Sequence, residues 1–364
     1  MPPRCLPLAH RRTAVAAALA LPLVVAGCGA AEQTQRRTVE AELQSASAFL
    51  LDSRALSVRM AFTDPAGSAR RALTAAEGAA PEALVDVLLG GSISWTIDPA
   101  GERTMRDLQA MPADTPAADV FAAMGLSVAV AADGGPIAQL RLVDGDLYAA
   151  ADLGRIGSIA GKAGGPEAAD GVDDLAQQAP PGVAPLLGDV RAGEWVRLPL
   201  APYAKTIDER GASEAPAPEG LEDDLLAAVT PFVQVTDAGG EGGERILDVQ
   251  VQARKAVEAL VRAVQRTALA PQLDDVAADA LSGLTDGTVE GQVRLQDGHL
   301  TSVVLDLASA ARLSTQTVPD LFGSTLTVTV DDTADEVVAP EPVSDVDVAE
   351  LVEGVLGGAG DLDT

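Results

Sequence analysis

The chain has 364 residues, of which 47% are hydrophobic and only 2% aromatic, and its formal net charge at pH 7 is −29. This length and hydrophobic fraction allow one large domain or two smaller ones with a substantial core. The negative charge repels phosphate backbones and anionic membrane surfaces, so we expect no nucleic-acid partner and no membrane attachment through a basic patch.

The first 27 residues have the parts of a lipoprotein signal peptide. Three arginines give a positively charged start, and the uncharged, nearly apolar segment Ala14–Ala26 follows. That segment is shorter than the about 20 residues that a membrane-spanning helix needs, but it has the length of a signal-peptide core. It leads into Leu-Val-Val-Ala-Gly-Cys, the pattern of a lipobox, in which small residues precede an acylated cysteine. We predict export, cleavage before Cys28, lipid attachment (palmitate) to its sulfur, and a location at the extracytoplasmic face of the cell membrane.

The remaining chain offers little reactive chemistry. Cys5 leaves with the signal peptide, and Cys28 carries lipid, so no cysteine is left for a disulfide or for thiol catalysis. One histidine, His299, remains, which is too few for the usual zinc sites. Residues 157–163 resemble a phosphate-binding loop only superficially, because Ile156 stands where the motif requires glycine. We therefore expect no enzyme, no cofactor and no metal.

The N-terminal half of the predicted mature chain begins with a short tether and a helix over 38–51. Alternating apolar residues then predict half-buried strands, and Asp-Gly at 144–145 predicts a hairpin turn, because glycine takes the positive φ that such turns need. The strands are expected at 55–62, 93–97, 126–130, 137–143 and 147–149, with a short helix over 153–160.

The C-terminal half repeats this pattern of hairpins and helices. Its clearest hairpin turns at Asp297-Gly298 between two alternating apolar runs. Strands are expected at 194–198, 232–235, 246–251, 289–295, 303–307 and 325–330, and helices at 257–268, 273–284 and 348–356. Strands joined by hairpins, with helices inserted between groups, are typical of an α+β domain that has one antiparallel sheet.

Four stretches resemble lipoproteins of the LppX/LprG type in the LolA-like superfamily. They are the strand 55–62 after an N-terminal helix, the hairpin 142–148, the paired strands 233–251 running into a helix, and the hairpin 291–307. The resemblance implies a strongly curved antiparallel β half-barrel with helices packed on its concave face. The expected organisation is a signal peptide (1–27), a tether (28–37), a LolA/LppX-like domain (38–335) with loop insertions near 65–90, 163–192 and 211–225, and an acidic tail (336–364).

The same resemblance implies a protein that binds lipid or glycolipid, and carries it, in an apolar cavity between sheet and helices. An ordinary closed core would show the same residues, so the alternative is a non-catalytic envelope structural, interaction or sensor lipoprotein with a protein partner. The candidate cavity residues are the inward-facing strand positions Leu56, Val58, Met60, Ile93, Trp95, Val128, Val130, Leu140, Val293 and Val303.

Overall fold

The computed structural model describes residues 33–75, 82–112, 115–132, 135–164, 193–200, 221–265, 281–314, 321–341 and 343–345. Several predictions lie outside these residues. They are the signal peptide with Cys28, most of the insertions at 163–192 and 211–225, most of the helix at 273–284, and the helix at 348–356.

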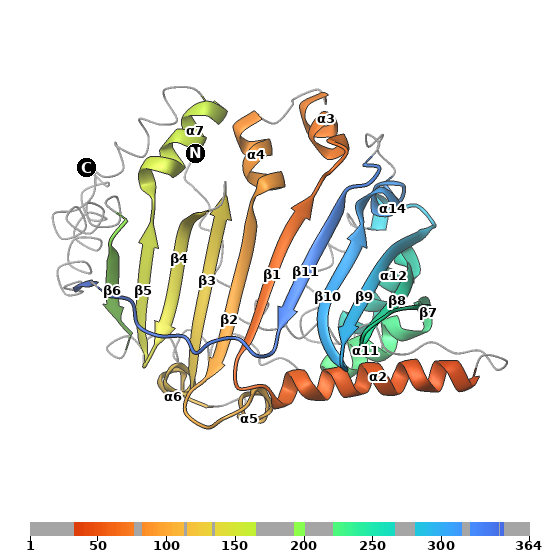
Figure 1. The fold of residues 1–364 in the computed structure, drawn as a ribbon, viewed down its shortest axis with the longest axis horizontal. Coiled ribbons are helices and arrows are strands. Elements are labelled where there is room, and N and C mark those ends of the chain that lie inside the picture. The colour runs from red at the N-terminus through yellow and green to blue at the C-terminus, as the bar shows by residue number, and fades with distance from the viewer. Residues whose placement is uncertain are drawn as a thin grey trace. The chain divides into compact units, whose positions relative to one another are not determined.

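Twelve strands form one mostly antiparallel sheet, with helices between groups of strands, which confirms the α+β class (Figure 1). The strands are β1 (Leu56–Thr63), β2 (Ser92–Pro99), β3 (Met124–Ala132), β4 (Gly135–Val143), β5 (Asp146–Ala151), β6 (Trp195–Pro199), β7 (Val233–Gly239), β8 (Glu244–Gln252), β9 (Thr288–Gln296), β10 (His299–Asp306), β11 (Thr325–Asp331) and β12 (Val343–Asp345). The helices are α2 (Gln33–Asp52), α3 (Ser68–Ala75), α4 (Glu82–Gly90), α5 (Met105–Gln109), α6 (Ala117–Ala123), α7 (Leu153–Gly164), α11 (Leu221–Val229), the 3-10 turn η4 (Thr230–Phe232), α12 (Ala253–Val264) and α14 (Leu307–Ala311).

These elements are divided between two compact units. The larger unit comprises residues 49–216, 302–311 and 317–364, and its strands follow the order β12-β6-β5-β4-β3-β2-β1-β11-β10. The smaller unit comprises residues up to 48, 217–301 and 312–316, and its strands follow the order β9-β8-β7. Helices α3 and α4 occupy the region near 65–90, which was expected to be a loop insertion.

The strong curvature expected for a half-barrel is wrong for the sheet of the larger unit. That sheet is open, since it ends at β12, and it is not strongly curled (Figure 1). Antiparallel sheets bend sharply where bulges or glycine kinks interrupt the ladder. From β11 through β1 to β6, the described ladders have one such irregularity, between Val130 and Ala131. The helices of this unit stand mainly at the two ends of the strands, with α3, α4 and α7 at one end and α5 and α6 at the other (Figure 1).

The predicted Asp-Gly hairpins are confirmed, and the backbone shows why these residues are there. Asp144 and Gly145 have φ angles of 52° and 79° between β4 and β5. Asp297 and Gly298 have φ angles of 52° and 88° between β9 and β10. Two consecutive positive φ angles match the right-handed twist of a hairpin, and glycine, aspartate and asparagine adopt them most readily.

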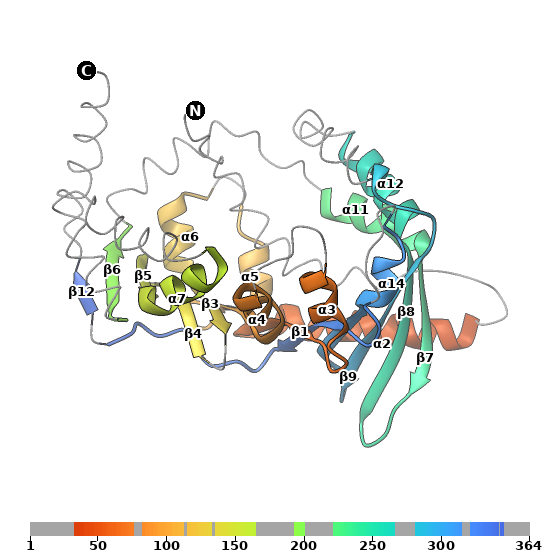
Figure 2. The ribbon, with the colours of Figure 1, turned by 90° about the horizontal axis from the view of Figure 1, so that it is seen from above.

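Helices α2 and α12 follow the apolar spacing of their sequences. In α2 the buried residues Val39, Leu43 and Ala46 recur every three or four positions, which places them on one stripe. In α12 the buried stripe consists of small residues such as Ala256 and Ala259. Small side chains let the helix backbone approach its neighbours closely, and Figure 2 shows α12 beside α11 in the smaller unit.

Candidate functional site

One face of the sheet in the larger unit is apolar across every strand from β10 to β6. Directly paired residues of antiparallel strands point to the same side, with their Cβ atoms about 5 Å apart. The strand registers therefore place apolar side chains in continuous rows. The middle rows read Val330, Val58, Trp95, Val128, Leu140, Ala149 and Val196, and then Val303, Val328, Met60, Ile93, Val130, Ala138 and Ala151.

This apolar face brings together nine of the ten predicted cavity residues. Six of them form a contiguous group on β1 to β4, which we call the central patch: Met60, Ile93, Trp95, Val128, Val130 and Leu140. Val303 extends the row of Met60 by way of Val328 on β11, and Leu56 and Val58 lie on the same face of β1. The tenth, Val293, belongs to the smaller unit, where it is 2% exposed and pairs with the fully buried Leu247.

Exposure separates the central patch from the packed part of the apolar face. Leu56 and Val58 are 5% and 1% exposed, as expected for a filled core. Ile93 and Leu140 are 43% and 46% exposed, although β2 and β4 each have a neighbouring strand on both sides. Large aliphatic side chains left uncovered together on a sheet face mark binding surfaces more often than isolated ones do.

The opposite face of the same strands is polar. Thr96 donates a hydrogen bond to Ser57 across the β1–β2 pair, at 3.1 Å between the oxygens. Arg141 lies on this face of β4, with its guanidinium 4.8 Å from the ring centre of Trp195. The two faces therefore differ sharply in chemistry, as the alternation of the sequence predicts.

Residues 332–341, which we call the crossing segment, run over this polar face from β11 to β12 (Figure 1). The amide of Val337 donates to Asp98 Oδ2 at 2.9 Å, and Arg141 Nη1 donates to the carbonyl of Val338 at 3.0 Å. A side chain at Gly125 would reach within 3.1 Å of Val337 Cβ, so glycine makes room for this crossing. The first ten residues of the expected acidic tail, from position 336, include part of this segment and β12.

A hydrogen-bonded aspartate fastens the end of β1 in the larger unit. Asp64 accepts hydrogen bonds from the amides of Ser68 and Arg70, at 2.8 and 2.9 Å, and from the hydroxyls of Ser68 and Ser324, at 3.1 and 2.9 Å. Burial alone raises the pKa of Asp64, but the donated hydrogen bonds outweigh it and lower the pKa from 3.8 to about 2. The carboxylate is thus a saturated acceptor that joins helix α3 to the start of β11, and this saturation suits a structural role.

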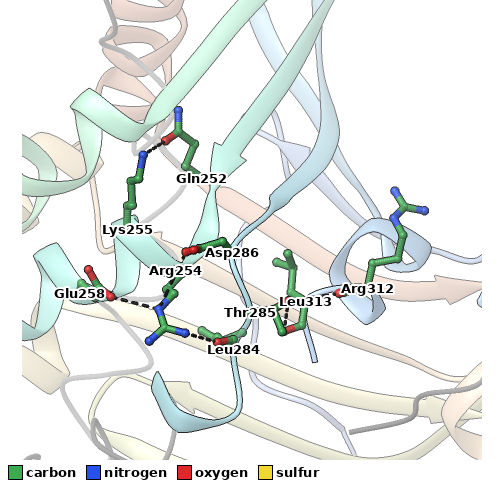
Figure 3. Close-up of polar contacts among 9 residues, drawn as sticks. All are labelled: Gln252, Arg254, Lys255, Glu258, Leu284, Thr285, Asp286, Arg312 and Leu313. Atoms are coloured by element: carbon green, nitrogen blue, oxygen red, sulfur yellow. Dashed lines mark hydrogen bonds and ion pairs between the residues drawn. The ribbon is translucent and has the colours of Figure 1, made fainter. Parts of the chain in front are cut away.

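The smaller unit has a polar cluster at the start of α12, drawn in Figure 3. Arg254 Nε lies 3.2 Å from Glu258 Oε1 and 4.0 Å from Asp286 Oδ1, and Arg254 Nη1 donates to the carbonyl of Leu284 at 2.7 Å. The amide of Thr285 donates to the carbonyl of Leu313 at 2.6 Å. The Arg254 guanidinium thus joins α12 to the segment just before β9, which is typical of a structural contact.

The described residues do not gather metal ligands or form a spanning helix. Within the ranges given above, no three histidine, cysteine, aspartate or glutamate residues lie together as a metal would require. None of the helices in this part of the chain is both long and apolar enough to cross a membrane. The sequence did not predict the crossing segment, because this acidic, proline-containing stretch has no periodic apolar pattern.

These features define an α+β protein with an open, mostly antiparallel sheet, one face of which is apolar and partly uncovered. No protein-family model matches the chain, and no curated protein matches it. Among solved structures, the chain is similar to lipoprotein LppX of Mycobacterium tuberculosis, with 11% sequence identity and a TM-score of 0.32 over 84% of this chain and 99% of that one.

Proposed function

We propose that this protein is an extracytoplasmic lipoprotein that binds lipid or glycolipid on the apolar face of its larger unit, without catalysis. The observation that carries the proposal is the central patch, where Ile93 and Leu140 stay 43% and 46% exposed in the interior of a sheet. A flexible acyl chain laid across this patch would remove apolar surface from water. Each methylene group buried in this way contributes up to about 0.8 kcal/mol.

The chemistry of the patch favours acyl chains over compact polar ligands. Its side chains are aliphatic apart from Met60 and Trp95, and their contacts with hydrocarbon are non-directional. Specificity for chain structure would therefore be loose. The crossing segment occupies the polar face of the same strands, which leaves the apolar face as the surface for the ligand.

Anchoring through Cys28 is the second part of the proposal, and it rests on the sequence of the lipobox. Two or three acyl chains on the N-terminal cysteine hold a protein stably at a membrane, whereas a single chain does so only weakly. A tether of this kind would keep the central patch within reach of membrane lipid at the extracytoplasmic face. Carriage of lipid between partners would be an extension of this binding.

The test is native mass spectrometry and organic extraction of the full chain purified in mild detergent. We expect co-purifying lipid with the unchanged protein and a large loss of it in the double variant Ile93→Gln/Leu140→Gln. Both side chains are already partly exposed, so the fold should tolerate the change. Val338→Gln is the matched control, because Val338 is also an exposed apolar residue (58%) but lies on the crossing segment, away from the patch.

Two results would contradict lipid binding at this site. One is a chain that carries no lipid and takes up none when phospholipid or glycolipid is added. The other is a double variant that retains as much lipid as the Val338→Gln control. The first result would favour the alternative of an envelope structural, interaction or sensor lipoprotein, whose acidic surface engages a protein partner.

A further inference from the structure

Trp95 carries an unusual polar atom on the central patch. Its side chain lies on β2 between Val58 of β1 and Val128 of β3, so the indole projects from the apolar face. The indole Nε1 is buried and has no hydrogen-bond partner among the described residues. An indole N–H can only donate, and burying it without an acceptor is costly.

The neighbouring side chains cannot supply that acceptor. The residues that surround Trp95 on this face, directly or diagonally, are hydrocarbon apart from the weakly accepting thioether of Met60. Two other buried atoms of the described chain lack hydrogen bonds, Glu42 Oε2 and Arg245 Nε, but these lie 3.2 Å apart as an ion pair. The Trp95 N–H differs because it has no such counterpart in the described part of the chain.

The presence of tryptophan at position 95, and not phenylalanine, also suggests a role for the N–H. A phenylalanine would fill much of the same apolar space without bringing a donor that must be desolvated. The second tryptophan of the chain, Trp195, lies on the polar face, where Arg141 stacks on its ring. The donor at position 95 thus lies on a surface whose other side chains offer it no strong acceptor.

We propose that the Trp95 side chain turns when lipid binds, so that its indole N–H, which is covered in this structure, donates a hydrogen bond to an uncharged acceptor in the lipid, such as the carbonyl oxygen of an ester or amide linkage. This inference rests on the proposed function. The acceptor is uncharged because the surrounding residues of the apolar face carry no cation, and an anion buried there would be strongly unfavourable. Trp95 would then determine specificity by fixing how far along the lipid the linkage lies, while the rest of the patch binds chains without direction.

The test compares two lipids that differ only in this acceptor: a dipalmitoyl glycerol, which has two ester carbonyls, and the dihexadecyl glycerol diether, which has none. The full chain should bind the diester roughly three- to tenfold more tightly, the gain expected for one net hydrogen bond. Trp95→Phe should bind both lipids with equal affinity, and Trp195→Phe should keep the preference. Circular dichroism and unfolding curves check that each variant is folded.

A spectroscopic readout keeps the test decisive even if Trp95→Phe fails to fold. In the Trp195→Phe variant, Trp95 gives the single indole N–H resonance of the chain, since the sequence has two tryptophans. That resonance should shift downfield with the diester and much less with the diether. Equal binding of the two lipids by the unchanged protein, or equal shifts, would overturn the role of Trp95 and leave lipid binding intact. Failure to bind either lipid would instead contradict the proposed function.

Discussion

Replacing Asp64 by asparagine should lower the stability of the larger unit at neutral pH. Asparagine keeps one acceptor oxygen but places an amide N–H₂ opposite the amide of Arg70, which now donates to Oδ2 at 2.9 Å. The pKa of Asp64 falls from 3.8 to about 2 in the folded protein, a shift that corresponds to about 2.4 kcal/mol of stabilisation of the charged form. Because Asp64 is only half-buried and solvent screens part of this interaction, we expect Asp64→Asn to cost about 1–2 kcal/mol.

The pH dependence gives a sharper version of the same prediction. A carboxylate whose folded pKa is depressed contributes its full stabilisation above the unfolded pKa, and this contribution is lost as the pH falls through the folded pKa. The difference in unfolding free energy between the unchanged protein and Asp64→Asn should therefore be largest at pH 7 and should shrink between about pH 4 and pH 2.

Urea unfolding of dilute protein, followed by tryptophan fluorescence at pH 7 and pH 2.5, measures this difference. Both tryptophans, Trp95 and Trp195, lie in the larger unit, so the signal reports the unit that contains Asp64. Asp107→Asn is the matched control. Asp107 accepts hydrogen bonds from the amide and hydroxyl of Thr104, which are the main cause of its lowered pKa, but it is fully exposed, and its replacement should cost less. Equal stability of Asp64→Asn and the unchanged protein at pH 7, or a difference that is the same at both pH values, would refute the reasoning.

Three further changes test other parts of the structure. Val58→Trp should destabilise the larger unit by about 1–3 kcal/mol in urea unfolding, because Val58 is 1% exposed and the core has no room for an indole; an unchanged midpoint would show that the site is open. Cys28→Ala should abolish metabolic labelling with palmitate and leave the signal peptide attached, as intact mass would show; labelling that persists would place the lipid elsewhere. Arg141→Leu should weaken the attachment of the crossing segment by about 1 kcal/mol, because it removes the hydrogen bond to that segment and the stacking on Trp195. Proteolysis of the segment should then be faster than in the control Arg59→Leu, which changes an arginine on the same face. Equal cleavage rates in the two variants would contradict this.

Much of the fold could be predicted from local patterns. The strand predicted at 93–97 lies within β2, and the helix predicted at 153–160 is the first part of α7. The Asp-Gly turns were predicted because their positive φ angles depend on two adjacent residues. Curvature could not be predicted in this way, since it depends on where the ladders are interrupted. The described ladders from β11 through β1 to β6 have a single irregularity, between β3 and β4.

For the candidate site, too, local patterns could be predicted from the sequence and contacts between strands could not. Alternation in the sequence identified the side of each strand that is apolar, so nine of the predicted residues share one face of the larger unit. It could not separate the filled position of Val58 from the uncovered position of Leu140, because both alternate in the same way. The unpartnered N–H of Trp95 was equally hidden, since the absence of an acceptor depends on side chains from three strands.

The sequence by itself determined the acidic composition, the period-two strands and their turns, because composition is a sum over the chain and the strands and turns depend on adjacent residues; the N-terminal lipobox is a prediction from the same kind of local pattern. Only the tertiary structure decided which apolar rows meet, which of them stay exposed, and that residues 332–341 cross the polar face to pair β12 with β6. Those features arise from contacts between residues far apart in the chain, such as Val337 with Asp98. The free energy of such contacts depends on packing and on the exclusion of water, which no local pattern records.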